Sequence, residues 1–113
     1  MTLWMPDTYF RQGDPFACTL TICNPTQDTY NAVPVFAILD VYGQYFFAPS
    51  FTEFDHYEMN VAPGESEIQV VPEISWPANA GSAAGIKFYA AMTDAGITQL
   101  FGNMDTFEFA WGS

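Results

Sequence analysis

The chain has 113 residues, of which half are hydrophobic and 18% aromatic, and its thirteen acidic residues against two basic ones give a net charge of −11. This length suits one domain with its own core, and the composition excludes a disordered chain. Because a strongly negative surface repels phosphate groups, neither nucleic acid nor a membrane surface is expected as a partner. The charge could also attract cations such as calcium, but a soluble, self-repelling surface explains it more simply.

The two ends of the sequence suggest an excised domain. Met1 is either a true start or a start codon added to such a domain, and Gly112-Ser113 resembles a tail left by cloning. No apolar run is long enough to span a bilayer, and no signal-peptide pattern precedes Leu3. We therefore expect residues 1–113 to form one domain taken from a larger protein.

The first expected strands lie on either side of a turn. Residues 3–5 form a short apolar segment, residues 9–10 continue it after a bend, and Gly13-Asp14-Pro15 is typical of a turn. Residues 16–23 then alternate between apolar and polar side chains. This alternation predicts a half-buried strand whose inward side chains are Phe16, Cys18, Leu20 and Ile22.

The most apolar pair of expected strands lies in residues 33–47. Alternate side chains of an extended segment point to opposite faces, so two sets form: Val33, Val35, Ala37, Leu39 and Val41 on one face, and Pro34, Phe36, Ile38 and Asp40 on the other. Tyr42-Gly43-Gln44 breaks the segment, and residues 45–47 are expected to return beside it. Because both faces are largely apolar, one makes the core and the other needs a loop or a partner to cover it.

Further strands are expected at residues 57–61, 65–76, 85–93, 97–101 and 107–111. Pro72 interrupts one of them, which predicts an edge strand or a bulge. In residues 85–93 the alternation places Ile86, Phe88, Ala90 and Met92 inward and Lys87, Tyr89 and Thr93 outward. No segment shows convincing helical periodicity with caps, so seven to nine short strands predict an all-β, antiparallel sandwich.

Cys18 and Cys23 lie in the same expected strand and therefore point to opposite faces. An extended chain separates them by roughly 16 Å, at about 3.3 Å per residue, which is too far for a disulfide. Two cysteines five residues apart with a single histidine also make a poor zinc motif. Cys18 is expected to be a buried apolar residue and Cys23 a thiol at the strand end.

Several turn and core motifs occur together along the chain. They are Gly13-Asp14-x-Phe16, Leu20-x-Ile22-x-Asn24, Ala62-Pro63-Gly64-Glu65, Trp76-Pro77 and Gly85-x-x-Phe88-x-Ala90-x-Met92-Thr93-Asp94. In this order they resemble the immunoglobulin-like repeats of bacterial secreted and cell-surface proteins, the CARDB-type adhesion-related domains. The resemblance covers most of residues 3–111. It implies export, no catalysis, and a role in adhesion, spacing or substrate attachment.

The outer face of the central strand pair is the expected ligand or partner face, with Phe36, Ile38 and either Tyr45 or Phe46. An apolar patch there suits docking against a neighbouring domain or against a second copy of the chain. Trp4, Trp76, Trp111 and six tyrosines raise a second interpretation, because flat aromatic faces stack on sugar rings. Trp76 and Trp111, however, stand where packing alone explains them.

The acidic segment around His56, the single histidine, has the only weak calcium candidates: Glu53, Asp55 and Glu58. His56 beside Asp55 could support acid–base chemistry, but no nucleophile motif supplies a partner. Asp94 and Asp105, with Asn103, could converge at one end of the sandwich, although such residues are also the usual ones in turns. An exposed acidic loop is the simpler interpretation of the first group, and ordinary turn residues are the simpler interpretation of the second.

The sequence therefore predicts an immunoglobulin/fibronectin-III-like β-sandwich of seven to nine strands. We expect a non-catalytic, extracellular or cell-surface module that serves as a spacer, docking or adhesion unit of a larger secreted protein. Its expected partners are neighbouring domains or a second copy, and it needs no cofactor. The alternative is a carbohydrate-binding module that uses its surface aromatics on a polysaccharide.

Overall fold

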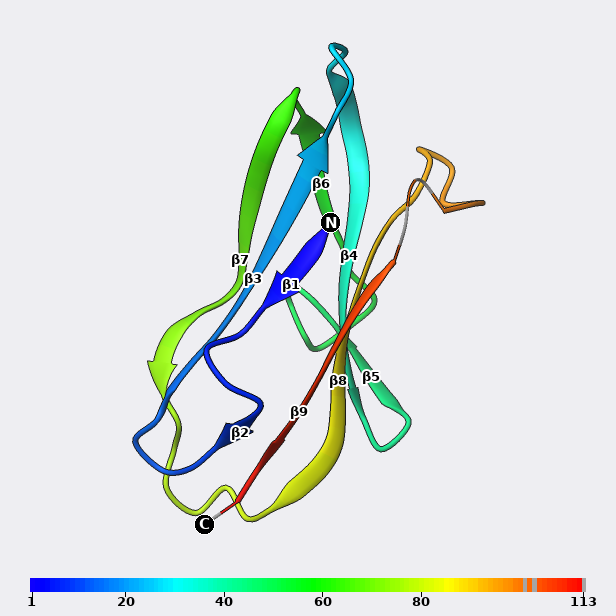
Figure 1. Cartoon of the computed structure of the whole chain (residues 1–113). Coiled ribbons are helices and arrows are strands. Elements are labelled where there is room, and N and C mark those ends of the chain that lie inside the picture. The colour runs from blue at the N-terminus through cyan, green and yellow to red at the C-terminus, as the bar shows by residue number, and fades with distance from the viewer. Residues whose placement is uncertain (101, 103, 113) are drawn as a thin grey trace.

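The computed structural model describes residues 1–100, 102 and 104–112, and these residues form nine β-strands and no helix. The strands are β1 (Thr2–Trp4), β2 (Tyr9–Phe10), β3 (Pro15–Asn24), β4 (Tyr30–Val41), β5 (Gln44–Phe47), β6 (Tyr57–Val61), β7 (Gly64–Ser75), β8 (Ala83–Met92) and β9 (Asp105–Trp111). They pack as two sheets, which Figure 1 shows nearly edge-on. The all-β, immunoglobulin-like sandwich expected from the sequence is confirmed.

The smaller sheet has the order β1-β3-β7, and the larger has the order β2-β9-β8-β4-β5 with β6 also paired to β4. β5 and β6 share one edge of β4, because β5 pairs with residues 38–41 and β6 with residues 30–35. Every pairing is antiparallel except that of β2 with β9, which is parallel. The N-terminal segment thus contributes β1 to one sheet and β2 to the other.

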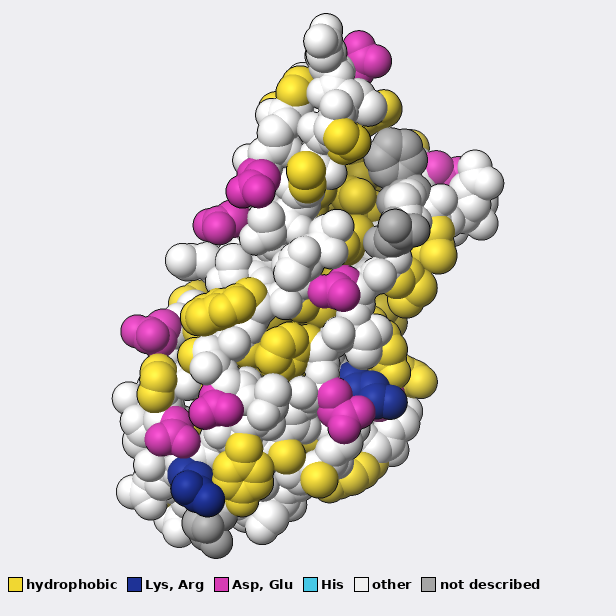
Figure 2. Space-filling view, in the orientation of Figure 1, with side chains coloured by type: hydrophobic (Ala, Val, Ile, Leu, Met, Phe, Trp, Pro, Cys, Tyr) yellow, Lys and Arg dark blue, Asp and Glu magenta, His cyan; other side chains and the backbone are white. Residues whose placement is uncertain are grey.

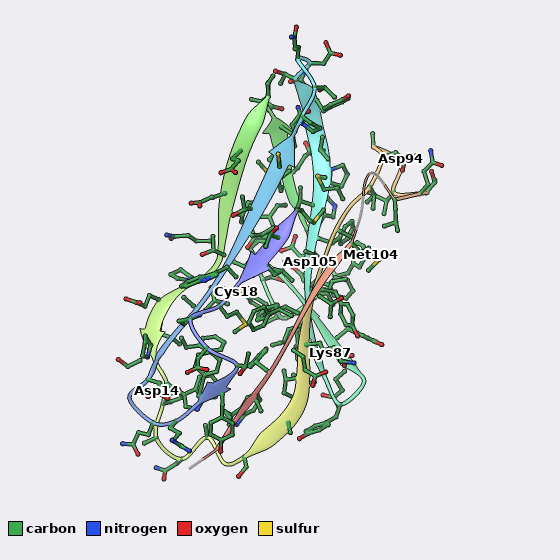
Figure 3. The ribbon with its side chains drawn as sticks, in the orientation of Figure 1. Asp14, Cys18, Lys87, Asp94, Met104 and Asp105 are labelled. Atoms are coloured by element: carbon green, nitrogen blue, oxygen red, sulfur yellow. The ribbon has the colours of Figure 1, made fainter. Side chains whose placement is uncertain are left out.

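The core between the sheets consists of the inward side chains predicted from the alternation. Phe16, Cys18, Leu20 and Ile22 of β3 face Ile86, Phe88, Ala90 and Met92 of β8, and all eight are buried. Cys18 is buried and Cys23 exposed, and both thiols are free, as expected from their spacing. Figure 3 shows the Cys18 side chain directed into the space between the sheets.

β7 is an edge strand, because within the described part of the chain it pairs with β3 alone. Pro72 therefore needs no ladder partner on its free side, as predicted. The register of the β3–β7 pair shifts on either side of Cys18, so a bulge accompanies the proline-containing half of β7.

An aromatic cluster closes the lower end of the sandwich in Figure 1, where β2, β9 and the start of β3 meet. Its members are Phe10, Phe16, Trp76, Phe109 and Trp111, with ring centroids 4.9–6.2 Å apart. The Trp111 indole N–H donates to the carbonyl of Ala80 at 3.0 Å. Packing therefore accounts for both of these tryptophans.

The structure differs from the prediction in two C-terminal segments. Instead of a strand at residues 97–101, Thr93 and Leu100 form one isolated bridge around a turn, with Ile97 at a positive φ of 54°. Phe101 lies outside the described residues, as do Asn103 and Ser113. Gly112 is buried, and its N–H donates to the carbonyl of Phe10 at 3.0 Å, so it takes part in the fold.

Candidate functional site

The outer face of the six-stranded sheet displays an apolar patch arranged in rows across the strands. In one row Ile38 of β4 lies between Phe47 of β5 and Tyr89 of β8, and in the next Phe36 lies beside Ala91. Side chains of directly opposed residues share a face, so these rows all face away from the core. They form the part of the sheet that needs cover from outside the strands.

Part of this cover comes from the loop between β5 and β6. The Phe54 ring lies 5.9 Å from the ring of Phe36 and 5.0 Å from that of Phe47, and the His56 ring lies 5.1 Å from Phe36. Phe36 is consequently only 6% exposed, whereas Phe54 is 65% exposed. The loop thus buries Phe36 and places the exposed ring of Phe54 over it on the surface. We call Phe36, Ile38, Phe47, Phe54 and Tyr89 the outer patch.

The four residues predicted for this face do not all lie on it. Phe36, Ile38 and Tyr45 do, and Tyr45 is 59% exposed beside Asp40. Phe46 does not, because it pairs with Leu39, whose side chain packs against the core. The prediction left Tyr45 and Phe46 as alternatives, and alternation within β5 decides for Tyr45, with Phe47 two residues further along.

Two other members of the outer patch were not assigned to it from the sequence. Tyr89 was expected to point outward from its strand, and the missing step was the register that places it beside Ile38. Phe54 lies in a loop, where no periodicity specifies the direction of a side chain. Its contacts with Phe36 and Phe47 depend on the folded path of the chain.

A charged row borders the outer patch. Lys87 of β8 stands between Asp40 of β4 and Glu108 of β9, and Tyr45 continues the row beyond Asp40. Opposite charges at directly opposed positions of a sheet stabilise the pairing by about 0.2–1 kcal/mol. Figure 3 labels Lys87 on β8.

The weak calcium candidates are not brought together. Oδ1 of Asp55 accepts the backbone N–H of His56 at 2.9 Å. Within residues 1–100, 102 and 104–112, no three acidic, histidine or cysteine side chains gather closely enough to hold a metal ion. Glu53 in the loop and Glu58 on β6 are both exposed.

Asp94 and Asp105 do not converge either, contrary to one possibility drawn from the sequence. Figure 3 shows Asp94 in the protruding turn and Asp105 at the start of β9. The Asp94 carboxylate accepts hydrogen bonds from the N–H and hydroxyl of Thr98, and these bonds hold its pKa below the ordinary value. The Asp105 carboxylate instead accepts the N–H of Leu3.

His56 lies between aromatic rings and a backbone carbonyl. Its ring is 5.1 Å from that of Phe36 and 6.3 Å from that of Phe54, and Nδ1 lies 3.1 Å from the carbonyl oxygen of Tyr57. These contacts position the imidazole as a packing element of the loop that covers Phe36. They also fix the path of the chain into β6.

Inside the core, burial raises the pKa of the Cys18 thiol to about 12. Burial also raises the pKa of the Tyr57 hydroxyl, with smaller contributions from the charges of Cys18 and Asp55. Because a thiol is nucleophilic as its thiolate, Cys18 is protonated and inert at neutral pH.

No protein-family model, curated protein or solved structure matches this chain. Among the described residues, no helix has the length and apolar character that a membrane crossing requires.

Proposed function

We propose that the chain is a non-catalytic, extracellular β-sandwich module that serves as a spacer, docking or adhesion domain of a larger secreted protein. The observation that supports this best is the outer patch, in which an exposed Phe54 and the half-buried row of Phe47, Ile38 and Tyr89 lie on the outer face of the six-stranded sheet. Solvent-facing apolar clusters of this kind are typical of surfaces that dock another protein. The motifs that resemble CARDB-type domains agree with such a role.

The arrangement of the patch favours docking over chemistry. Its side chains are aromatic or aliphatic, and His56 is engaged with Phe36, Phe54 and the carbonyl of Tyr57. Four of its five members project from strands of one sheet, which limits their motion and lowers the entropic cost of binding. In the isolated chain, the complementary apolar surface closest at hand is the same patch on a second copy, and in the parent protein it is a neighbouring domain.

Sedimentation equilibrium of the isolated chain tests this proposal. We expect a reversible dimer whose population rises with protein concentration, and we expect Ile38→Glu to make the chain monomeric by placing a charge at the centre of the patch. Gln69→Glu is the matched control, because it adds the same charge to the outer face of the other sheet. A wild-type chain that stays monomeric at millimolar concentration would count against the proposal, as would equal dimerisation of the two variants.

A polysaccharide is a weaker candidate for this same face. Phe36 is buried beneath Phe54 and His56, and Phe46 faces the core side, so two of the four predicted residues cannot offer a ring face to a sugar. Tyr45 remains exposed, but its neighbours in the row are the charged side chains of Asp40 and Lys87 and not a polar groove.

A further inference from the structure

The outer face of the three-stranded sheet exposes the indole ring of Trp4. Trp4 at the end of β1 is 55% exposed, whereas its neighbours Leu3 and Met5 are buried at 4% each. The alternation of β1 therefore directs Leu3 into the core and the indole to solvent. Within the described part of the chain, this ring belongs to neither the buried core nor the aromatic cluster.

Polar side chains surround Trp4 in rows across the three-stranded sheet. Thr19 and Gln69 share its row, and Thr2, Thr21 and Glu67 form the next one. Trp4, the three threonines, Glu65 and Glu67 line a shallow hollow of about 550 Å³. Figure 2 shows this side of the molecule, with acidic side chains along the edge where β7 lies.

All of these side chains project from strands. Thr19, Thr21, Glu65 and Glu67 belong to the β3–β7 pair, which keeps a continuous register from Thr19 to Asn24. Their spacing is therefore set by the backbone ladder, about 7 Å along a strand for residues on one face. A ligand that binds here pays little for ordering the site.

The mixture of one flat apolar ring with hydroxyls, an amide and carboxylates matches the two kinds of surface on a sugar. The C–H groups of a pyranose ring pack on the electron-rich face of an indole, and its hydroxyls exchange hydrogen bonds with threonine, glutamine and glutamate side chains. An apolar protein partner would leave these polar groups without hydrogen bonds, which is costly. A basic peptide fits less well, because hydroxyl and amide groups share the row of Trp4, whereas the carboxylate of Glu67 lies in the next row.

We infer that this face is a binding platform for a neutral polysaccharide, with a sugar ring stacked on Trp4 and its hydroxyls held by Thr19, Thr21 and Glu67. Acidic polysaccharides are excluded by the carboxylates of the hollow and by the net charge of −11. The platform and the outer patch lie on opposite sheets. A negative result for binding at one surface therefore leaves the proposal for the other surface unaffected.

Affinity electrophoresis with embedded polysaccharides tests the platform. The probes are soluble xylan, β-glucan, galactomannan and hydroxyethyl cellulose as neutral polymers and polygalacturonate as an acidic one. We expect retardation by at least one neutral polymer and none by polygalacturonate. Trp4→Ala should weaken the retarding interaction at least tenfold, and Trp4→Phe should keep part of it because a ring face remains.

Two controls separate binding from folding. Trp4 is exposed, so Trp4→Ala should keep the thermal unfolding midpoint of the wild type, and Tyr45→Ala, on the other sheet, should keep full retardation. Glu67→Ala should weaken retardation, whereas Glu73→Ala, an exposed glutamate on the same strand outside the hollow, should not. The inference is overturned if no neutral polymer retards the chain, if Trp4→Ala is retarded as strongly as the wild type, or if polylysine binds in a Trp4-dependent way while the neutral polymers do not.

Discussion

The backbone N–H of Leu3 donates a 2.7 Å hydrogen bond to Oδ2 of Asp105, across 102 positions of sequence. Leu3 is the middle residue of β1 in the three-stranded sheet, and Asp105 is the first residue of β9 in the six-stranded sheet. One side-chain carboxylate therefore satisfies an edge N–H of one sheet from the edge of the other. The bond ties both ends of the described chain into the same sandwich.

Asp105→Ala should lower the free energy of unfolding by about 1–2 kcal/mol, because it leaves the partly buried N–H of Leu3 without its charged acceptor. Asp105→Asn keeps an oxygen acceptor and should lose less. Urea unfolding followed by tryptophan fluorescence measures both changes. Asp28→Ala is the matched control, since it removes the same charge from an exposed residue; an equal loss in that variant would show that the hydrogen bond contributes nothing.

Stability should fall as the pH rises from about 9 towards 12, because Cys18 loses its proton earlier in the unfolded chain than in the folded one. The folded pKa of about 12 lies above the ordinary thiol value of 9.0, so in this window the unfolded state holds fewer protons and is favoured. The raised pKa of Tyr57 acts in the same direction. Urea midpoints at pH 8 and pH 10.5 measure the fall.

Cys18→Ala is the variant that isolates this effect. It should be less stable at pH 8, because it leaves a small cavity in the core, yet its stability should decline less steeply towards pH 10.5. In the wild type, Cys23 should react with a thiol reagent in the folded protein and Cys18 only on unfolding. Two equally fast thiols at neutral pH would contradict the burial of Cys18.

The parts of the fold that could be predicted are those where local sequence decides the structure. Strict alternation in residues 16–23 and 86–92 specified which side chains enter the core, and Pro72 marked an edge strand. The strand predicted at residues 97–101 was wrong for its described residues 97–100, which form bends and one isolated bridge; Ile97, Thr98 and Leu100 have strand-like side chains that favoured the prediction. Hydrogen bonds from Thr98 to the Asp94 carboxylate outweigh that local preference.

The candidate faces were less predictable because they depend on pairing between distant strands. Alternation placed Ile38 on the outer face, but only the register of β5 shows that Phe47, and not Phe46, lies beside it. The polar rows around Trp4 likewise combine β1, β3 and β7. A single sequence gives the period of each strand and leaves the offset between strands undetermined.

Thr98→Val should raise the pKa of the Asp94 carboxyl towards its ordinary value, since the Thr98 hydroxyl is the largest cause of the lowered pKa. The backbone N–H of Thr98 remains as a donor at 2.7 Å, so the pKa should stay somewhat low. In the wild type, the hydrogen bonds to ionised Asp94 stabilise the turn fully at pH values above the ordinary pKa of this carboxyl. Their contribution is lost as the pH falls through the lowered pKa of the folded protein. Carbon-detected NMR titration of the side-chain carboxyl measures the pKa, with Thr106→Val as the control. An unchanged Asp94 pKa in Thr98→Val would show that the Thr98 hydroxyl does not lower this pKa.

Lys87→Glu should destabilise the six-stranded sheet more than Lys87→Gln does. Lys87 lies directly between Asp40 and Glu108, so the glutamine variant loses two favourable cross-strand pairs, together about 0.5–1 kcal/mol. The glutamate variant places three carboxylates in one row and adds repulsion of similar size. Because the charges are partly screened by solvent, the difference between the two variants should shrink in 1 M salt.

Arg11→Glu is the matched control for this series, because it makes the same change of net charge at the exposed basic residue whose guanidinium lies 5.2 Å from the ring centre of Tyr9. Unfolding free energies of the four chains, measured in low and high salt, separate the local row from the global charge. If Arg11→Glu costs as much as Lys87→Glu at both salt concentrations, self-repulsion of the acidic surface explains the loss and the charged row has no specific role. A larger, salt-sensitive loss at Lys87 alone would show that the row pins the register of β4, β8 and β9, on which the outer patch depends.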